Sequence, residues 1–111
     1  MKLRLSAYTL MLAMPSLLAA QAGNVENGKR LYLKDGCYEC HGYAGQGGAG
    51  ARLAPKVLAT ASFIKYVRHP AGAMPPYTSK VATDAELADI RAFLATIPEP
   101  PPLKSIPILN Q

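Results

Sequence analysis

The chain has 111 residues, which is enough for one small domain and no more. Half of its residues are hydrophobic, and 12 basic residues against 7 acidic ones give a formal charge of +5. That charge is mild, and no basic stripe interleaved with aromatic side chains occurs, so the composition argues against a nucleic-acid partner. The two cysteines allow at most one disulfide, so another source of stability is expected for so small a chain.

The first 22 residues differ in character from the rest of the chain. They begin with the basic residues Lys2 and Arg4, continue with a mostly apolar run over residues 5–18, and end on Ala20-Gln21-Ala22. This order is typical of a secretory signal peptide, and the run is shorter than the roughly 20 apolar residues that cross a bilayer. We therefore expect residues 1–22 to be cleaved. The product would be an exported, periplasmic chain with no integral membrane span and a net charge of +3, from 10 basic and 7 acidic residues.

The first helix is predicted over residues 25–34, because Asn24 is a suitable N-cap and Gly36 follows just past the end. Five of the nine glycines then fall between residues 42 and 50, which argues against regular structure there. A second helix is predicted over residues 62–68, where a proline two positions later stops it.

The strongest helix signal covers residues 84–97. Thr83 and Glu86 stand at the spacing of a capping box. A stripe of apolar residues follows at helical spacing: Leu87, Ile90, Leu94 and Ile97. The period-2 alternation of strands does not occur in the sequence, so we predict an all-α domain over residues 23–98.

Prolines dominate the residues after this helix and favour an extended tail over residues 99–111. The tail carries four large apolar residues: Leu103, Ile106, Ile108 and Leu109. A solvated tail is normally polar, so these side chains must either fold back over the domain or rest on a partner protein. Both alternatives stay open from the sequence.

Residues 37–41 read Cys37-Tyr38-Glu39-Cys40-His41, which is the C-x-x-C-H motif for attachment of c-type haem. Two thiols at this spacing can form thioethers with the two vinyl groups on one edge of a porphyrin. The adjacent His41 then lies under the ring as an iron ligand. One covalent haem c, bound through Cys37 and Cys40, is therefore the expected cofactor, and it would add a large apolar body to a small core.

Three other interpretations of the same residues compete with haem. A thioredoxin-like dithiol requires a βαβ setting, which the sequence does not predict. A tetrahedral zinc site needs four ligands, which could be Cys37, Cys40, His41 and His69. A plain disulfide also suits an exported chain, although closing so short a ring gains little entropy.

Two residues compete for the sixth coordination position of a haem iron. Met74 is the only methionine after residue 22, and it precedes Pro75 and Pro76 in an irregular segment, where it would be poor core filler. His69 is the only other histidine, but it follows a predicted helix, where a cation interacts favourably with the helix dipole. We expect Met74 to be the ligand, with His69 as the alternative.

The motif at residues 37–41, the segment from Arg68 to Pro75 (Arg-His-Pro-Ala-Gly-Ala-Met-Pro) and the two end helices carry a resemblance. On these features the chain resembles class I monohaem cytochromes c over residues 23–97. The resemblance implies a small cytochrome c fold, with three to four helices around a covalent haem. It also implies that the end helices cross at Gly28 packed against Phe93, and that the carbonyl of Pro55 orients the proximal histidine.

Ligation by His and Met leaves no open position for a substrate and raises the reduction potential. We therefore expect a one-electron carrier between exported redox proteins, and not an enzyme. The alternative is the electron-outlet subunit of a larger periplasmic dehydrogenase; a haem peroxidase or gas sensor is less favoured. Residues 40–83 contain five basic and no acidic residues, so they could form a positive collar that docks acidic partners, or could merely balance the haem propionates.

Residues 45–50 also fit the pattern G-x-G-x-x-G letter for letter. A dinucleotide fingerprint would need a strand before it, a helix after it and an acidic residue about 20 positions further on. The sequence predicts none of these features. We therefore expect no nucleotide and interpret the segment as a loop beside the haem.

Overall fold

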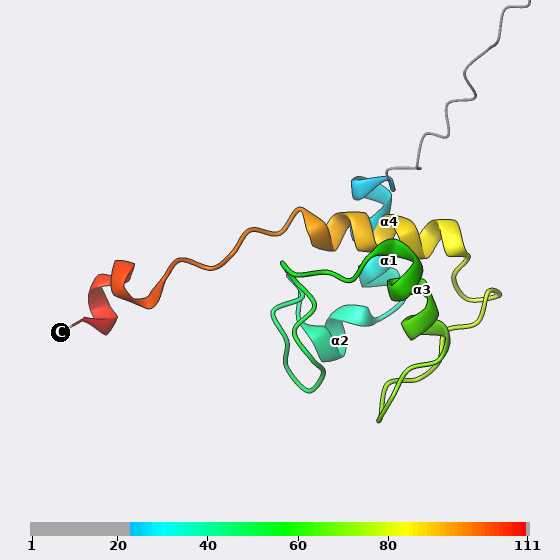
Figure 1. The fold of residues 1–111 in the computed structure, drawn as a ribbon, viewed down its shortest axis with the longest axis horizontal. Helices are drawn as coiled ribbons and strands as arrows, with labels where there is room; N and C mark the ends of the chain where they lie inside the picture. The colour runs from blue at the N-terminus through cyan, green and yellow to red at the C-terminus, as the bar shows by residue number, and fades with distance from the viewer. Residues whose placement is uncertain (1–22, 111) are drawn as a thin grey trace, which may run out of the picture.

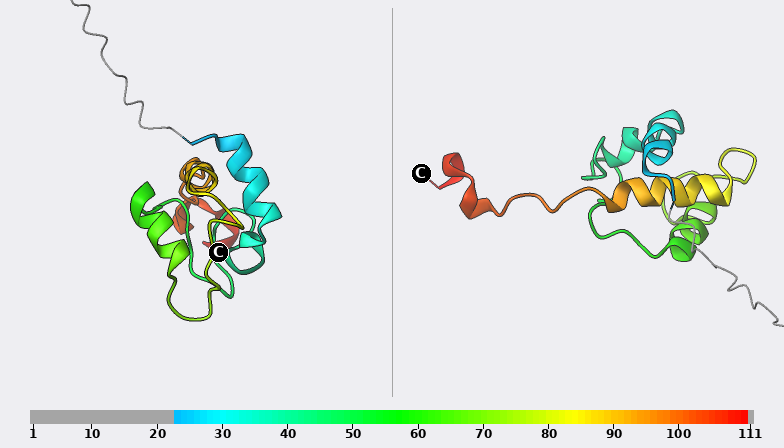
Figure 2. Two further views of the ribbon diagram at one scale, coloured as in Figure 1. Left: turned by 90° about the vertical axis from the view of Figure 1, so that its right-hand side faces the viewer. Right: turned by 90° about the horizontal axis from the view of Figure 1, so that it is seen from above.

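The computed structural model describes residues 23–110, so the predicted signal peptide lies outside the described residues. Four helices form the domain: α1 over Val25–Lys34, α2 over Cys37–His41, α3 over Thr60–Arg68 and α4 over Asp84–Ala95. These residues contain no strand, which agrees with the all-α prediction. Helix α4 lies between α1 and α3 and contacts both, as Figure 2 shows. Within residues 23–110, no helix has the length and apolar character needed to cross a membrane.

Helices α1 and α4 cross at Gly28. A methyl group on Gly28 would overlap the main-chain carbonyl of Asp89, so the crossing needs a glycine here. The predicted crossing at Gly28 is confirmed, and the atoms nearest to a methyl group there belong to the main chain of Asp89 and Ile90. Phe93 packs against Tyr32, with ring centroids 5.5 Å apart, and each ring lies one turn beyond the crossing point on its helix.

The predicted caps of α1 and α4 are both present. The side chain of Asn24 accepts a hydrogen bond from the main-chain N–H of Asn27 at 2.9 Å. Thr83 and Glu86 form the capping box, in which each side chain accepts from the other residue's N–H, at 3.2 and 2.7 Å. The bounds of α1 match the prediction, whereas α3 begins two residues earlier and α4 ends two residues earlier than predicted.

The core lies where α1, α3 and α4 meet. Its buried hydrophobic residues are Leu31, Tyr32, Ala54, Phe63, Val67, Ala82, Leu87, Ile90 and Leu94. Around them lies a rim of half-buried apolar side chains, which we call the core rim: Cys37, Tyr38, Leu53, Val57, Ile64, Met74, Tyr77, Phe93 and Ile97. A core this small is usually supplemented by a disulfide, a metal or a cofactor.

The residues after α4 run away from the domain as an extended segment (Figure 1). This tail ends in two short 3₁₀ helices, η1 over Leu103–Ser105 and η2 over Pro107–Leu109. They contact each other and no other helix of the described chain. The apolar side chains of Leu103, Ile108 and Leu109 are exposed. In this structure the tail is extended, and its apolar side chains are not covered by the helices of the domain.

Candidate haem-attachment site

Helix α2 presents the C-x-x-C-H residues directly after α1. The chain turns between the two helices at Gly36, whose φ of 76° lies in the left-handed region that favours glycine. Cys37 is half-buried in the core rim, and Cys40 is exposed. The pKa of the Cys37 thiol is raised to about 11, mainly by burial and to a smaller extent by the nearby Asp35 carboxylate. The unmodified thiol is therefore neutral near pH 7.

The glycine-rich loop after α2 folds back onto the C-terminal end of that helix. The N–H of Gly47 donates to the carbonyl of His41, and the N–H of Gly50 donates to the carbonyl of Cys40, both at 2.8 Å. From α1, the buried Tyr32 donates its hydroxyl to the carbonyl of Gly42 at 2.7 Å. Burial raises the pKa of Tyr32 to about 12, so the hydroxyl keeps the proton that it donates. These bonds fix α2 between α1 and the loop.

The same loop orients the ring of His41. Its Nδ1 lies 2.6 Å from the carbonyl oxygen of Ala51, and because a carbonyl can only accept, Nδ1 carries the proton. The other ring nitrogen, Nε2, makes no hydrogen bond within the part of the chain that the structure describes. This is the tautomer in which Nε2 can bind a metal.

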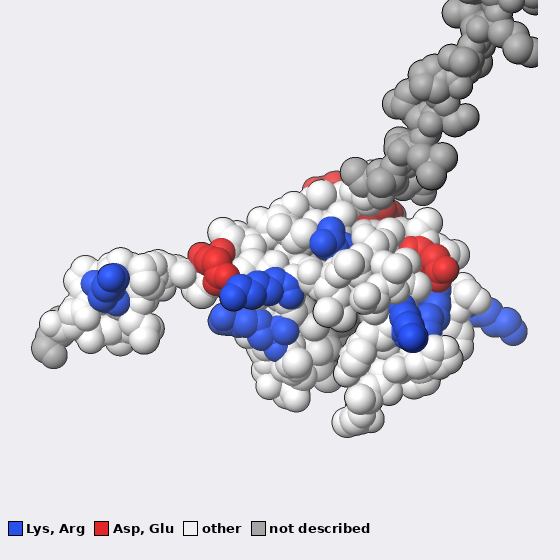
Figure 3. Space-filling view, viewed as in Figure 1, with Lys and Arg blue, Asp and Glu red and all other residues white. Residues whose placement is uncertain are grey.

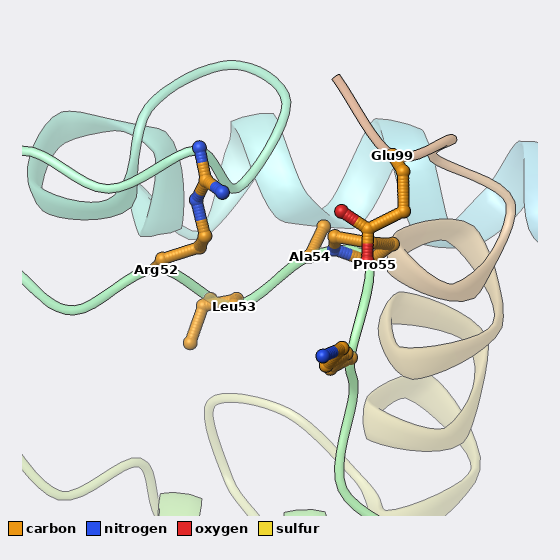
Figure 4. Close-up of a pocket in the computed structure, with 6 residues that line it drawn as sticks. Arg52, Leu53, Ala54, Pro55 and Glu99 are labelled. Carbon is orange, nitrogen blue, oxygen red and sulfur yellow. The ribbon is translucent and has the colours of Figure 1, made fainter. Parts of the chain in front are cut away.

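The prediction that Pro55 supplies this carbonyl is wrong. The loop returns to α2 through the main chain of Gly50, so Ala51 faces His41 before the chain reaches Pro55. Pro55 instead lines a separate pocket together with Glu99 (Figure 4). No sequence signal marks Ala51, because it contributes only a main-chain group.

Met74 and His69 have different surroundings. Met74 is half-buried and packs against the core in the same rim as Cys37. His69 is exposed and stands at the C-terminal end of α3, where its N–H donates to carbonyls of the last turn. Met74 thus lies among the half-buried apolar side chains around the core, whereas His69 faces solvent.

The competing interpretations of the motif find no support in residues 23–110. No three His, Cys, Asp or Glu side chains come together there in a way that could hold a metal ion, so the zinc-site alternative is not supported. Cys37 and Cys40 are not joined in a disulfide. A thioredoxin-like dithiol would need strands, which this part of the chain does not form.

The residues present fit a covalently attached haem. Both thiols lie on one short helix, and the next side chain is a histidine whose Nε2 is left for iron. The half-buried side chains of the core rim, Cys37 and Met74 among them, offer the apolar contact that a porphyrin requires. The donor set is therefore that of a c-type haem site.

The five basic residues between positions 40 and 83 are not all available to dock an acidic partner. Arg68 is only 16% exposed, and its Nη2 pairs with Asp84 at 2.5 Å, so its role is structural. Arg52 and Lys56 are exposed, and together with Glu99 they line the pocket of about 290 Å³ in Figure 4. Figure 3 shows basic side chains beside an acidic one where the tail leaves the domain. The end of the domain nearest the tail thus carries exposed positive charge.

Comparison with known proteins gives one family match. Residues 23–94 match the family model described as cytochrome C oxidase, cbb3-type, subunit III. The match covers α1, α2, α3 and all but the last residue of α4, and it excludes the tail. Neither a search of curated proteins nor a search of solved structures gives a match to the chain.

Proposed function

The chain belongs to this family of c-type cytochromes, and we propose that it is an exported one-electron carrier with His41 and Met74 as axial ligands. The family binds haem c covalently, and Cys37 and Cys40 have the spacing that this attachment requires. The observation that carries the proposal is the hydrogen bond from His41 Nδ1 to the carbonyl of Ala51, which leaves Nε2 for the iron.

When bound, the haem supplies one-electron chemistry, because its iron can be reduced and reoxidised without a substrate forming a bond to it. The residues of the chain hold and tune this group. Cys37 and Cys40 anchor it, and His41 supplies the proximal nitrogen. Met74 would hold the iron together with His41, which would leave no position for a substrate and would raise the reduction potential.

Ligand binding distinguishes an electron carrier from a haem enzyme or a gas sensor. With both axial positions filled, carbon monoxide should not change the absorption spectrum of the ferrous protein. Met74→Ala should open the sixth position, abolish the weak far-red sulfur-to-iron band of the ferric protein and lower its reduction potential. His69→Ala is the control. If His69→Ala has these effects and Met74→Ala does not, the ligand assignment is wrong.

Export is proposed because residues 1–22 have the features of a signal peptide and because thioether attachment of haem takes place outside the cytoplasm. Protein made in a host with haem-attachment machinery should have the mass of residues 23–111 plus one haem. Extraction with acid and acetone should leave the haem on the protein. A mass that includes residues 1–22 would contradict cleavage, and release of the haem would contradict covalent attachment.

The tail favours a second candidate, in which the chain is the electron-outlet subunit of a larger periplasmic dehydrogenase. Its exposed apolar side chains, on an arm that the domain does not cover, suit burial in a partner protein. Copurification of the native chain with a flavin, molybdenum or quinone enzyme would support the subunit role. Recovery as a lone, haem-loaded protein would support the free carrier.

A further inference from the structure

The segment that carries Met74 has few attachments to the rest of the domain. It connects α3 to α4, and a methyl group on Gly72 would meet no atom within 4 Å. Among the described residues, no hydrogen bond involves residues 70–76. Something other than the segment's own hydrogen bonds must therefore hold Met74 in place.

Tyr77, three residues after Met74, anchors this segment to the rest of the domain through hydrogen bonds. Its N–H donates to the carbonyl of Val67 at 3.1 Å, and its carbonyl accepts from Arg68 Nη1 at 2.8 Å. Its hydroxyl donates to the carbonyl of Asp35 at 2.9 Å. Tyr77 thus joins the Met74 segment both to the last turn of α3 and to the junction that leads into the attachment helix.

Two prolines lie between Tyr77 and Met74, the proposed iron ligand. Pro75 and Pro76 have φ angles fixed by their rings, so the main chain between Met74 and Tyr77 has few free torsions. A movement of Tyr77 is therefore less easily absorbed by the main chain before it reaches Met74. Arg68, which holds the carbonyl of Tyr77, is itself anchored to α4 through its ion pair.

We propose that Tyr77 is a positioning residue that keeps Met74 on the iron and thereby sets how readily an external ligand displaces it. This inference rests on the proposed role of Met74 as the axial ligand. An external ligand binds only to molecules in which Met74 has left its position, so its apparent affinity rises in proportion to their fraction. Loss of one hydrogen bond of ordinary strength should raise that affinity about fivefold.

The test is a titration of the ferric haem protein with imidazole, followed by its absorption spectrum. Tyr77→Phe removes only the hydroxyl and keeps the ring and the main-chain bonds. Tyr66→Phe is the matched control, because Tyr66 lies on α3, is 45% exposed and makes no side-chain hydrogen bond in the described chain. Both variants are also made in the Met74→Ala background.

We expect Tyr77→Phe to raise the affinity for imidazole about fivefold, Tyr66→Phe to leave it unchanged, and Tyr77→Phe to add nothing once Met74 is replaced. An equal rise in both backgrounds would overturn the inference, because the hydroxyl would then act independently of Met74. A rise with Met74→Ala but not with Tyr77→Phe would also overturn it, while the ligand assignment would stand. No rise with Met74→Ala would overturn the ligand assignment and this inference with it.

Discussion

The ring of His41 is held by the main chain of a loop and not by another side chain. The carbonyl of Ala51 accepts from Nδ1, and the N–H groups of Gly47 and Gly50 hold the loop against α2. The exposed side chain of Ala51 is therefore free to vary. At Gly50 no side chain fits, because a methyl group would lie 2.8 Å from Cε1 and 2.9 Å from Nδ1 of His41.

Gly50→Ala should destabilise the haem-loaded protein by about 1–3 kcal/mol, the usual cost of overpacking. The φ of Gly50 lies outside the left-handed region, so the substitution adds no backbone strain of that kind. Denaturant unfolding measures the effect. Ala49→Ser, at an exposed neighbouring position, is the control and should cost less than about 0.5 kcal/mol. Equal stability of the two variants would mean that the loop can move away from His41 without loss.

Site residues whose chemistry requires a given side chain at a fixed spacing could be named from the sequence, as for Cys37, Cys40 and His41. Ala51 could not, because every residue has a carbonyl and only the folded loop decides which one faces the ring. Tyr77 could not either, since its hydroxyl reaches a residue 42 positions away in the sequence. Contacts of this kind depend on tertiary structure and leave no local pattern.

Among the helices, α1 is fixed to α4 both at the Gly28 crossing and at its own start. The carboxylate of Asp89 accepts from the N–H of Asn24 at 2.6 Å and from the side-chain amide of Asn27 at 2.7 Å. These bonds pin the beginning of α1 beside the crossing. Because α2 follows directly after α1, the attachment helix gains a fixed position relative to the rest of the domain.

Gly28→Ala should cost about 2 kcal/mol net, because the overpacking loss exceeds the gain of about 1 kcal/mol in helix propensity. The added methyl group would overlap the main-chain carbonyl of Asp89, which cannot rotate away as a side chain could. Thermal unfolding of the haem-loaded protein measures the loss, and Lys29→Ala, at the exposed next position, is the control. A Gly28→Ala protein as stable as Lys29→Ala would show that α1 and α4 separate without cost.

The capping box of α4 adds a dependence on pH. Hydrogen bonds from the main chain and side chain of Thr83 lower the pKa of Glu86. A group with a lowered native pKa stabilises the fold above its unfolded pKa, and this contribution is lost as the pH falls through the native pKa. The stability lost in Glu86→Gln should therefore be largest near neutral pH and shrink below the ordinary glutamate pKa of about 4.3.

Urea unfolding at a series of pH values measures this difference between the original protein and Glu86→Gln. Thr83→Ala removes the other side chain of the capping box and should lower the free energy of unfolding by about 1 kcal/mol at neutral pH. A difference for Glu86→Gln that grows on acidification would contradict the sign of the pKa shift.

Helix bounds could be predicted where local chemistry marks them, as Asn24 and Gly36 do for α1 and the capping box does for α4. The start of α3 could not be predicted in this way, because its N-cap, Ala59, makes no side-chain hydrogen bond and gives no capping signal. Helix α2 has only five residues, too few for a periodic apolar pattern. Its helical form depends on the loop and the Tyr32 hydroxyl that pack around it.

In the molecule as a whole, the tail places η1 and η2 away from the haem domain (Figure 1). The side-chain amide of Asn110 donates to the carbonyls of Lys104 and Ile106 at 2.9 and 3.0 Å, and so joins η1 to η2. The exposed Leu103, Ile108 and Leu109 are therefore held near one another at the end of the arm. Prolines in an extended conformation, at about 3.1 Å per residue, separate η1 and η2 from α4.

Truncation after Pro98 should change the free energy of unfolding by less than about 0.5 kcal/mol, because η1 and η2 contact no other helix of the described chain. The triple variant Leu103→Ser, Ile108→Ser, Leu109→Ser keeps the chain length, so it separates the effect of the apolar side chains from the effect of removing the chain. If the tail docks a partner, both variants should copurify with that partner less than the original chain does, while their thermal unfolding stays unchanged. A truncated protein destabilised by about 2 kcal/mol or more would mean that the apolar residues cover the domain after all, as buried apolar side chains contribute on that scale. A truncated protein that matches the original in both measurements would leave the tail with neither role.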